Sequence, residues 1–240
     1  MATIPMKLKE REEIVNGTMA FFLEKPAGFD FKPGQGMEVK LENPPETDAE
    51  GNSRAFSIAS APHEKYVMFA TRMRDAAMKN SLKKIPLETE VEVDGPWGDL
   101  KLHTRATRPG VFLAGGIGIT PFRSIVLDAA KNKLPHKLWL FYSNHRPEDA
   151  PFLEELERAE QMNPNFKMIA TMTEMPKSSR PWRGKTGLVD KAMLSEAIGD
   201  LNAPIYYLAG PGGMLNAMRK MLLDAGVNED DIRAEEFAGY

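Results

Sequence analysis

Cysteine is absent from the 240 residues of this chain. This absence excludes disulfides, zinc sites and iron–sulfur clusters held by cysteine, and a cysteine nucleophile. Histidine is also scarce, and the four histidines have no spacing typical of a zinc protease. Any chemistry must therefore come from a bound cofactor or from ordinary acid–base residues.

A strong charge of one sign and long apolar runs are missing as well. The formal net charge is −3, which gives no support to a nucleic-acid-binding surface. No apolar run approaches the length of about 18 residues that a membrane-spanning helix needs. Residues 1–10 lack the apolar core of a signal peptide. We therefore expect no nucleic-acid partner, no membrane partner and a cytoplasmic location.

The length suits two domains of about 100–150 residues each, and the pattern of apolar residues and turns changes near the middle of the sequence. The first hundred residues contain short segments rich in Val, Ile, Phe and Thr, separated by Gly and Pro turns. This pattern predicts a small antiparallel barrel or sandwich. The expected strands lie near 4–14, 17–23, 36–42, 53–60, 65–71 and 88–93.

From residue 111 onward, short apolar strands alternate with helical segments. This alternation predicts βαβ units and a parallel sheet. The polar stretch 103–109 separates the two patterns, so we expect domains at 1–104 and 105–240.

A glycine-rich turn follows the first strand of the second half and opens a helix. Glycines let backbone N–H groups approach an anion, and a helix N-terminus adds partial positive charge. The turn therefore predicts a dinucleotide phosphate site, and the alternative is a tight turn without a ligand. Its candidate binding residues are Gly115, Gly116, Gly118, Thr120 and Pro121.

A second turn of this kind contains Gly210 and Pro211, again between an apolar strand and a helix. Ligands of open α/β sheets lie at the carboxyl ends of the strands. Two such turns in one domain indicate a single crevice, with the phosphates at the first turn and a nicotinamide near the second.

The segment Arg54-Ala55-Phe56-Ser57 lies in a predicted strand of the first half. The planar guanidinium of Arg54 suits a phosphate, the ring of Phe56 suits stacking on a flavin, and the hydroxyl of Ser57 suits a flavin nitrogen. In isolation, the alternative is a core Phe56 beside a solvated arginine.

A helix predicted from Asp75 to about Lys84 supports this interpretation. Arg72 and Arg74 precede it, and Ala76 and Ala77 open its first turn with free N–H donors that suit a pyrophosphate. Asp75 is expected to face away from the anion, either as the N-cap or as a partner to Arg72 or Arg74. The alternative is a surface helix with no ligand.

Three of these motifs follow one another along the chain: the segment Arg54–Ser57, the helix that begins near Asp75, and the glycine-rich turn Gly115–Pro121. This order resembles the ferredoxin–NADP(+) reductase-like superfamily, and the resemblance covers essentially the whole chain. It implies an N-terminal FAD-binding six-stranded antiparallel β-barrel, followed by a C-terminal doubly wound parallel α/β domain that binds NAD(P)H. A protein of this kind passes a hydride from NAD(P)H to FAD and releases electrons to an external acceptor.

By this resemblance, Arg54 binds the FAD pyrophosphate, Phe56 packs on the isoalloxazine and Ser57 bonds near N5. The glycine-rich turn binds the dinucleotide, and Gly210 and Pro211 flank the nicotinamide. An aromatic residue at the C-terminus, Phe237 or Tyr240, would cover the flavin. Phe56, Ser57 and Tyr240 are thus the expected catalytic residues.

The chain departs from the superfamily at three positions. Phe56 stands where tyrosine is usual, Ala209 where cysteine is usual, and Ala76 where serine or threonine is usual. None of these changes removes the flavin site, because the cofactor carries the hydride chemistry and the protein positions it.

The choice between NADH and NADPH stays open at this point. Ser143 and Arg146, after the second strand of the α/β half, are candidates for holding a ribose phosphate. Glu174 follows the third strand, where NADP-specific relatives often carry an arginine.

The acceptor is also open: a ferredoxin, a flavodoxin, a partner subunit or a small oxidant. A second hypothesis is an electron-transfer or regulatory subunit of a larger redox complex without turnover of its own. A third is a nucleotide-binding module without a flavin.

Overall fold

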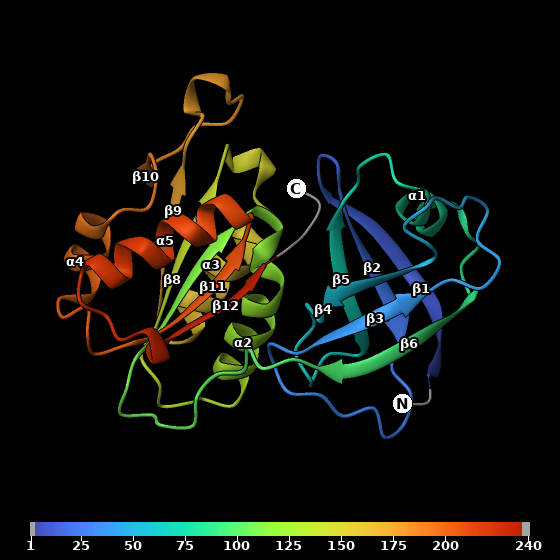
Figure 1. Ribbon diagram of the computed structural model, residues 1–240, viewed down its shortest axis with the longest axis horizontal. Helices are drawn as coiled ribbons and strands as arrows, with labels where there is room; N and C mark the ends of the chain where they lie inside the picture. The colour runs from blue at the N-terminus through green and yellow to red at the C-terminus, as the bar shows by residue number, and fades with distance from the viewer. Residues whose placement is uncertain (1–2, 237–240) are drawn as a thin grey trace.

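The computed structural model describes residues 3–236. The first half of the chain forms a six-stranded antiparallel sheet in the order β4-β3-β6-β1-β2-β5. The strands are β1 (Ile4–Val15), β2 (Thr18–Glu24), β3 (Gly36–Lys40), β4 (Ser53–Ser57), β5 (Tyr66–Arg72) and β6 (Glu90–Trp97). All six strands predicted from the sequence are present, and Figure 1 shows them as one body.

The outer strands β4 and β5 are joined just beyond the end of β4, which closes the sheet into a barrel. The Ala59 amide donates to the Met68 carbonyl at 2.7 Å, and the Met68 amide donates to the Ser60 hydroxyl at 2.9 Å. The rings of Phe56 and Phe69 stack across the same seam with their centroids 4.4 Å apart. The predicted six-stranded antiparallel barrel is therefore confirmed.

Helix α1 (Ala77–Lys84) packs against the barrel. The prediction that Asp75 caps this helix is wrong. The N-cap is Ala76, which has extended backbone geometry and no capping side chain. The Ala77 amide instead donates to the carboxylate of Asp48 at 3.0 Å. A cap supplied by a loop distant in sequence leaves no local signal.

The second half forms a fully parallel sheet in the order β10-β9-β8-β7-β11-β12. Its strands are β7 (Gly110–Gly115), β8 (Leu138–Asn144), β9 (Phe166–Met172), β10 (Lys185–Thr186), β11 (Ile205–Gly210) and β12 (Ile232–Glu236). The helices are α2 (Thr120–Lys131), α3 (Leu153–Met162), α4 (Lys191–Ile198) and α5 (Gly212–Asp224). Short 3-10 turns are η1 (Gly116–Ile119), η2 (Pro147–Asp149), η3 (Met175–Lys177) and η4 (Glu229–Asp231).

The helices cover both faces of this sheet. Apolar side chains of α2 and α3 pack in one core cluster with one set of strand residues. Those of α4 and α5 pack in another cluster with the alternate set. The predicted doubly wound parallel α/β fold is confirmed.

The order of the parallel strands reverses between β7 and β11. The chain runs outward from β7 through β8 and β9 to β10, and then returns to β11 on the other side of β7. A reversal of this kind opens a crevice at the carboxyl ends of the two strands, where ligands of such sheets bind. The crevice is therefore expected beyond Gly115 and Gly210.

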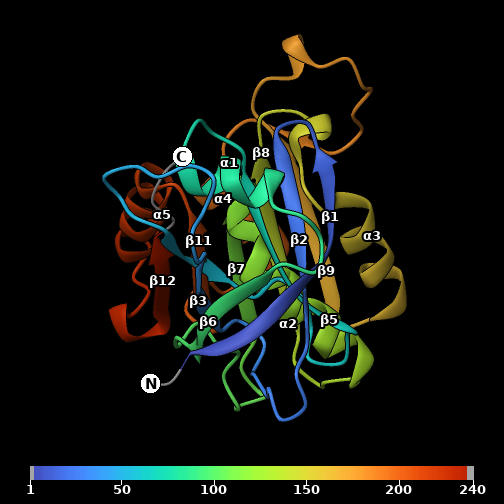
Figure 2. The same ribbon diagram turned by 90° about the vertical axis from the view of Figure 1, so that its right-hand side faces the viewer.

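The two domains lie side by side (Figures 1 and 2). The irregular segment 98–109 connects β6 to β7 and contains the predicted boundary between residues 104 and 105. That boundary stays a prediction. Within residues 3–236, every helix is too short or too polar to cross a membrane.

Candidate active site

The two glycine turns meet at the crevice, as the sequence predicts. A Cβ atom added at Gly118 would lie 2.5 Å from the carbonyl carbon of Ala209 and 2.7 Å from the nitrogen of Gly210. These neighbours are backbone atoms that cannot rotate away. Gly210 has a φ of +154°, and an added Cβ there would lie 3.1 Å from the Gly115 nitrogen. Only glycine lets the turns approach each other this closely.

Thr120, Pro121 and Pro211 have structural roles in the two turns. The Thr120 hydroxyl is buried and donates to the Ile117 carbonyl at 3.0 Å, which ties η1 to the start of α2. Pro121 lies in the first turn of α2, and Pro211 is the N-cap of α5. Direct binding of a dinucleotide by Thr120, Pro121 and Pro211 stays a prediction.

A cavity of about 320 Å³ lies beside β4, β5 and the start of α1, within the size range of small-molecule sites. Phe56 and Ser57 line it on one side, and Ala76 lines it on another. Ile117, from the glycine-rich turn of the other domain, completes its wall. The cavity predicted for the flavin thus reaches the turn predicted for the dinucleotide.

The lining of this cavity is rich in positive charge. Its charged residues are the cations Arg54, Arg72, Arg74 and Lys79 and the carboxylates Glu50 and Asp75. Burial lowers the pKa of Lys79, and the charges of Arg74 and Arg54 lower it further. The Nε atom of Arg72 is buried and has no hydrogen-bond partner among residues 3–236. Four cations and an unused buried donor fit a pyrophosphate group.

Sequence reasoning missed Lys79 as a member of this set. Its ammonium group donates to the Arg72 carbonyl at 2.8 Å, so the side chain folds back toward β5 and the cavity. In the sequence it is one of several lysines on a short helix, and no local pattern separates it from the solvated ones.

The acidic loop 43–52 lies against groups that are predicted to bind the phosphates. Glu50 pairs with Arg54 at 2.7 Å, and Asp48 lies 3.5 Å from the same guanidinium. Asp48 also accepts from the Ala77 amide. The donors predicted for a pyrophosphate therefore have carboxylate partners within the chain. An incoming phosphate would compete with these carboxylates.

Ser57 has a partner that the sequence did not reveal. Its buried hydroxyl donates to the carboxylate of Glu235 at 3.3 Å. Glu235 lies near the end of β12, in register with Ala209. Burial raises the pKa of Glu235, and the Ser57 hydrogen bond opposes the rise without cancelling it. The only sequence signal was an acidic pair just before the aromatic tail.

The predicted aromatic cover of the flavin lies outside the described residues. Phe237 and Tyr240 follow the last residue of β12. Their roles stay predictions.

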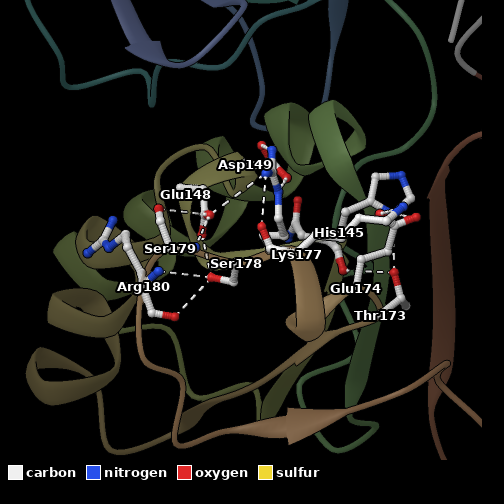
Figure 3. A network of polar contacts seen from close by, with 11 residues as sticks. His145, Glu148, Asp149, Thr173, Glu174, Lys177, Ser178, Ser179 and Arg180 are labelled. Carbon is white, nitrogen blue, oxygen red and sulfur yellow. Dashed lines mark hydrogen bonds and ion pairs between the residues drawn. The ribbon is translucent and has the colours of Figure 1, made fainter.

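The loops that follow β8 and β9 carry the carboxylates Glu148, Asp149 and Glu174, which lie in one network of polar contacts (Figure 3). Arg146 donates to both oxygens of Asp149, at 2.6 and 2.8 Å. Glu148 accepts from the Ser179 amide at 2.9 Å and from the Ser178 hydroxyl at 2.8 Å. The Ser179 amide leads the interactions that lower the pKa of Glu148 to about 2.

Glu174 is the third carboxylate of these loops. It pairs with Lys177 at 2.8 Å, a hydrogen bond that lowers the pKa of Glu174. Ser143 lies in register with Gly115 and is half-buried. The guanidinium of Arg146 thus has carboxylate partners of its own, although Arg146 was expected to hold a phosphate.

Comparison with known proteins agrees with this geometry. Residues 112–220 match the family model of the oxidoreductase NAD-binding domain. The reductase subunit of glycine betaine monooxygenase from Chromohalobacter salexigens is 28% identical over 92% of this chain and 60% of its own length. The Na(+)-translocating NADH-quinone reductase of Methylococcus capsulatus has a component that is 30% identical over 78% of this chain and 49% of its own length.

The whole two-domain fold matches a solved structure. A ferredoxin NADP+ reductase from Neisseria gonorrhoeae, solved with bound FAD and NADP, superimposes with a TM-score of 0.80 at 20% sequence identity, covering 98% of each chain. Residues 112–220 thus carry the sequence pattern of an oxidoreductase NAD-binding domain. The chain has the two-domain fold of a ferredoxin NADP+ reductase. It spans about half to three-fifths of the length of the curated relatives named above.

Proposed function

We propose that this protein is an FAD-dependent NADH oxidoreductase that passes electrons to an external acceptor. The observation that carries this proposal is the shared wall of the two sites. Ile117 of the dinucleotide turn lines the same cavity as Phe56 and Ser57. A reaction between two bound cofactors requires that their sites open onto each other.

The residues at this junction have distinct tasks. Bound FAD would accept a hydride from the nicotinamide and release electrons to the acceptor. Phe56 offers a ring face braced by Phe69, and Arg54 with Arg72, Arg74 and Lys79 offers charge for the pyrophosphate. Ser57 holds a hydrogen-bond donor at the crevice, where Glu235 accepts from it. No protein acid or base is needed for the hydride step itself.

We propose NADH as the coenzyme because of the charges beyond β8 and β9. A ribose 2′-phosphate needs free cations, whereas a ribose 2′-hydroxyl is compatible with carboxylates. The first cations after these strands already have carboxylate partners: Arg146 pairs with Asp149 and Glu148, and Lys177 pairs with Glu174. The word NADH in the name of the Methylococcus relative supports the same choice.

The acceptor is proposed to be a ferredoxin, a flavodoxin, a partner subunit or a small oxidant. The chain has no cysteine to hold an iron–sulfur cluster of its own. Curated relatives are named as reductase subunits, which favours a protein partner. The same names support a second candidate, an electron-transfer subunit that turns over only within a complex. A cytoplasmic location stays a prediction.

An absorbance spectrum and a reduction assay test the proposal. The purified protein, supplied with FAD, is mixed with NADH or NADPH without oxygen while the visible flavin absorbance is followed. Rapid bleaching by NADH, with turnover on ferricyanide, is the expected result. A protein that takes up no FAD would overturn the proposal, and one that binds FAD but resists both coenzymes would favour the second candidate.

A further inference from the structure

Arg123 is a buried cation at the boundary between the domains. It lies in the first turn of α2, shortly after the glycine-rich turn, and is only 5% exposed. A buried arginine requires partners for its charge and for its five N–H donors. The sequence hint is a charged residue within the largely apolar segment Pro121–Leu127.

Its five donors are all used, and they are divided between the two domains. On the barrel side, the guanidinium donates to the Ala59 carbonyl at 2.8 Å and to both oxygens of Glu64, at 2.8 and 3.0 Å. On its own side, it donates to both oxygens of Glu155 in α3, each at 2.7 Å. Such bidentate pairs restrict direction as well as distance.

The barrel partners of Arg123 lie next to the predicted flavin strand. Ala59 is two residues beyond Ser57, and the Ser124 hydroxyl donates to the neighbouring Ser60 carbonyl at 2.7 Å. Glu64 also accepts from the Ala61 amide at 2.6 Å, which holds the loop after β4 in shape. Arg123 thus connects the strand that carries Ser57 to the helix that follows the dinucleotide turn.

The covalent connection between the domains lies elsewhere. The segment 98–109 enters β7 at Gly110, whereas the crevice lies beyond Gly115. At roughly 3.3 Å per residue, this is about 16 Å from the crevice. The linker therefore gives weak control over the angle between the domains at the reacting end.

An apolar contact also spans the boundary, made by Ile117 with Ala20, Met68 and Ala70. Apolar contacts are non-directional, so this one holds the domains together without specifying their angle. Polar contacts supply the direction. Arg123 makes three of them across the boundary, and Ser124 with Ser60 and Ser57 with Glu235 make one each.

We propose that Arg123, through Glu64, is a positioning residue that sets the angle between the domains and hence the alignment of nicotinamide and flavin for hydride transfer. This inference rests on the proposed function. A misplacement of about 1 Å between reacting groups costs on the order of 100-fold in rate. A small rotation of one domain is therefore enough to slow the reaction.

The test compares two matched variants, Glu64→Gln and Glu155→Gln. Each keeps the side-chain length and an oxygen acceptor, and each removes one carboxylate charge from Arg123. Only the first weakens a contact between domains. Replacing Arg123 itself would leave two carboxylates unpaired, with a general loss of stability.

Two quantities are measured on the FAD-loaded proteins. Stopped-flow reduction gives the limiting rate and the dissociation constant of NADH, and residual dipolar couplings of backbone amides give the angle between the domains. We expect Glu64→Gln to lower the limiting rate by about tenfold, with unchanged coenzyme affinity and an altered or broadened domain angle. Glu155→Gln should change neither quantity appreciably.

An unchanged domain angle in Glu64→Gln, or an equal loss of rate in both variants, would overturn the inference. Failure of the proposed function looks different, because the unsubstituted protein itself would then not be reduced. The dipolar couplings of the proteins without FAD would still show whether Glu64 sets the domain angle.

Discussion

The hydroxyl of Ser57 and the carboxylate of Glu235 lie 3.3 Å apart across the domain boundary, although 178 positions separate them in the chain. Burial raises the pKa of Glu235 above its ordinary value of 4.5. The folded protein therefore binds this proton more tightly than the unfolded chain does. The stability that Glu235 contributes is complete below pH 4.5 and is lost as the pH rises through the raised pKa.

Glu235→Gln tests this relationship because glutamine cannot ionise. As the pH rises from 4.5 toward neutrality, the variant should gain stability relative to the unsubstituted protein. Urea unfolding across this range gives the difference in free energy at each pH. Ser57→Ala is the companion variant, because losing the hydroxyl should move the transition to higher pH. Parallel stability profiles for the unsubstituted protein and Glu235→Gln would show that Glu235 has an ordinary pKa.

Asp48→Asn should tighten FAD binding severalfold. The Asp48 carboxylate accepts from the N-terminus of α1 and lies beside Arg54, and both are predicted to bind the pyrophosphate. Asparagine caps helices as well as aspartate does, so the change removes repulsion of the phosphates with little effect on the helix. Fluorescence titration of the flavin-free protein with FAD measures the affinity.

Glu42→Gln is the control for this measurement. Glu42 carries the same charge as Asp48, but Arg54 and the Ala77 amide pair with Asp48 and not with Glu42. Its FAD affinity should match that of the unsubstituted protein. Weaker binding in Asp48→Asn would show that the carboxylate supports the site instead of competing for it.

Gly118→Ala should separate the two turns of the crevice. The added methyl group would press on the backbone of Ala209 and Gly210, and overpacking of this kind costs roughly 1–3 kcal/mol. NADH binding to the FAD-loaded protein should weaken at least tenfold, while FAD content is retained. Equilibrium unfolding and coenzyme titration measure the two effects.

Gly213→Ala is the matched control, because a methyl group at that position of α5 meets no atom within 4 Å. It should be neutral or stabilising by up to about 1 kcal/mol. Equal losses of coenzyme affinity in both variants would argue against a special role for the close approach at Gly118.

The sequence predicted the parts of the structure that arise from local periodicity of apolar residues and from glycine and proline turns. The six barrel strands, the parallel sheet and the junction of Gly118 with Gly210 all follow from local patterns. It did not predict Asp48 as the cap of α1, because that contact joins residues distant in sequence. Arg123 and Glu235 were missed for the same reason, since each acquires its role only when two domains pack together.

Asp149→Asn should shift coenzyme preference toward NADPH. Arg146 would lose its bidentate carboxylate partner, and its guanidinium would become available to a ribose 2′-phosphate. We expect kcat/KM for NADPH to rise severalfold while that for NADH changes little. The gain should shrink as salt is added, because Arg146 is partly exposed to solvent and salt screens its attraction for the phosphate. Asp224→Asn, which breaks the surface pair with Lys220, should leave the ratio of the two constants unchanged. If Asp149→Asn also leaves that ratio unchanged, the carboxylates beyond β8 do not determine coenzyme choice, and the preference must arise elsewhere in the crevice.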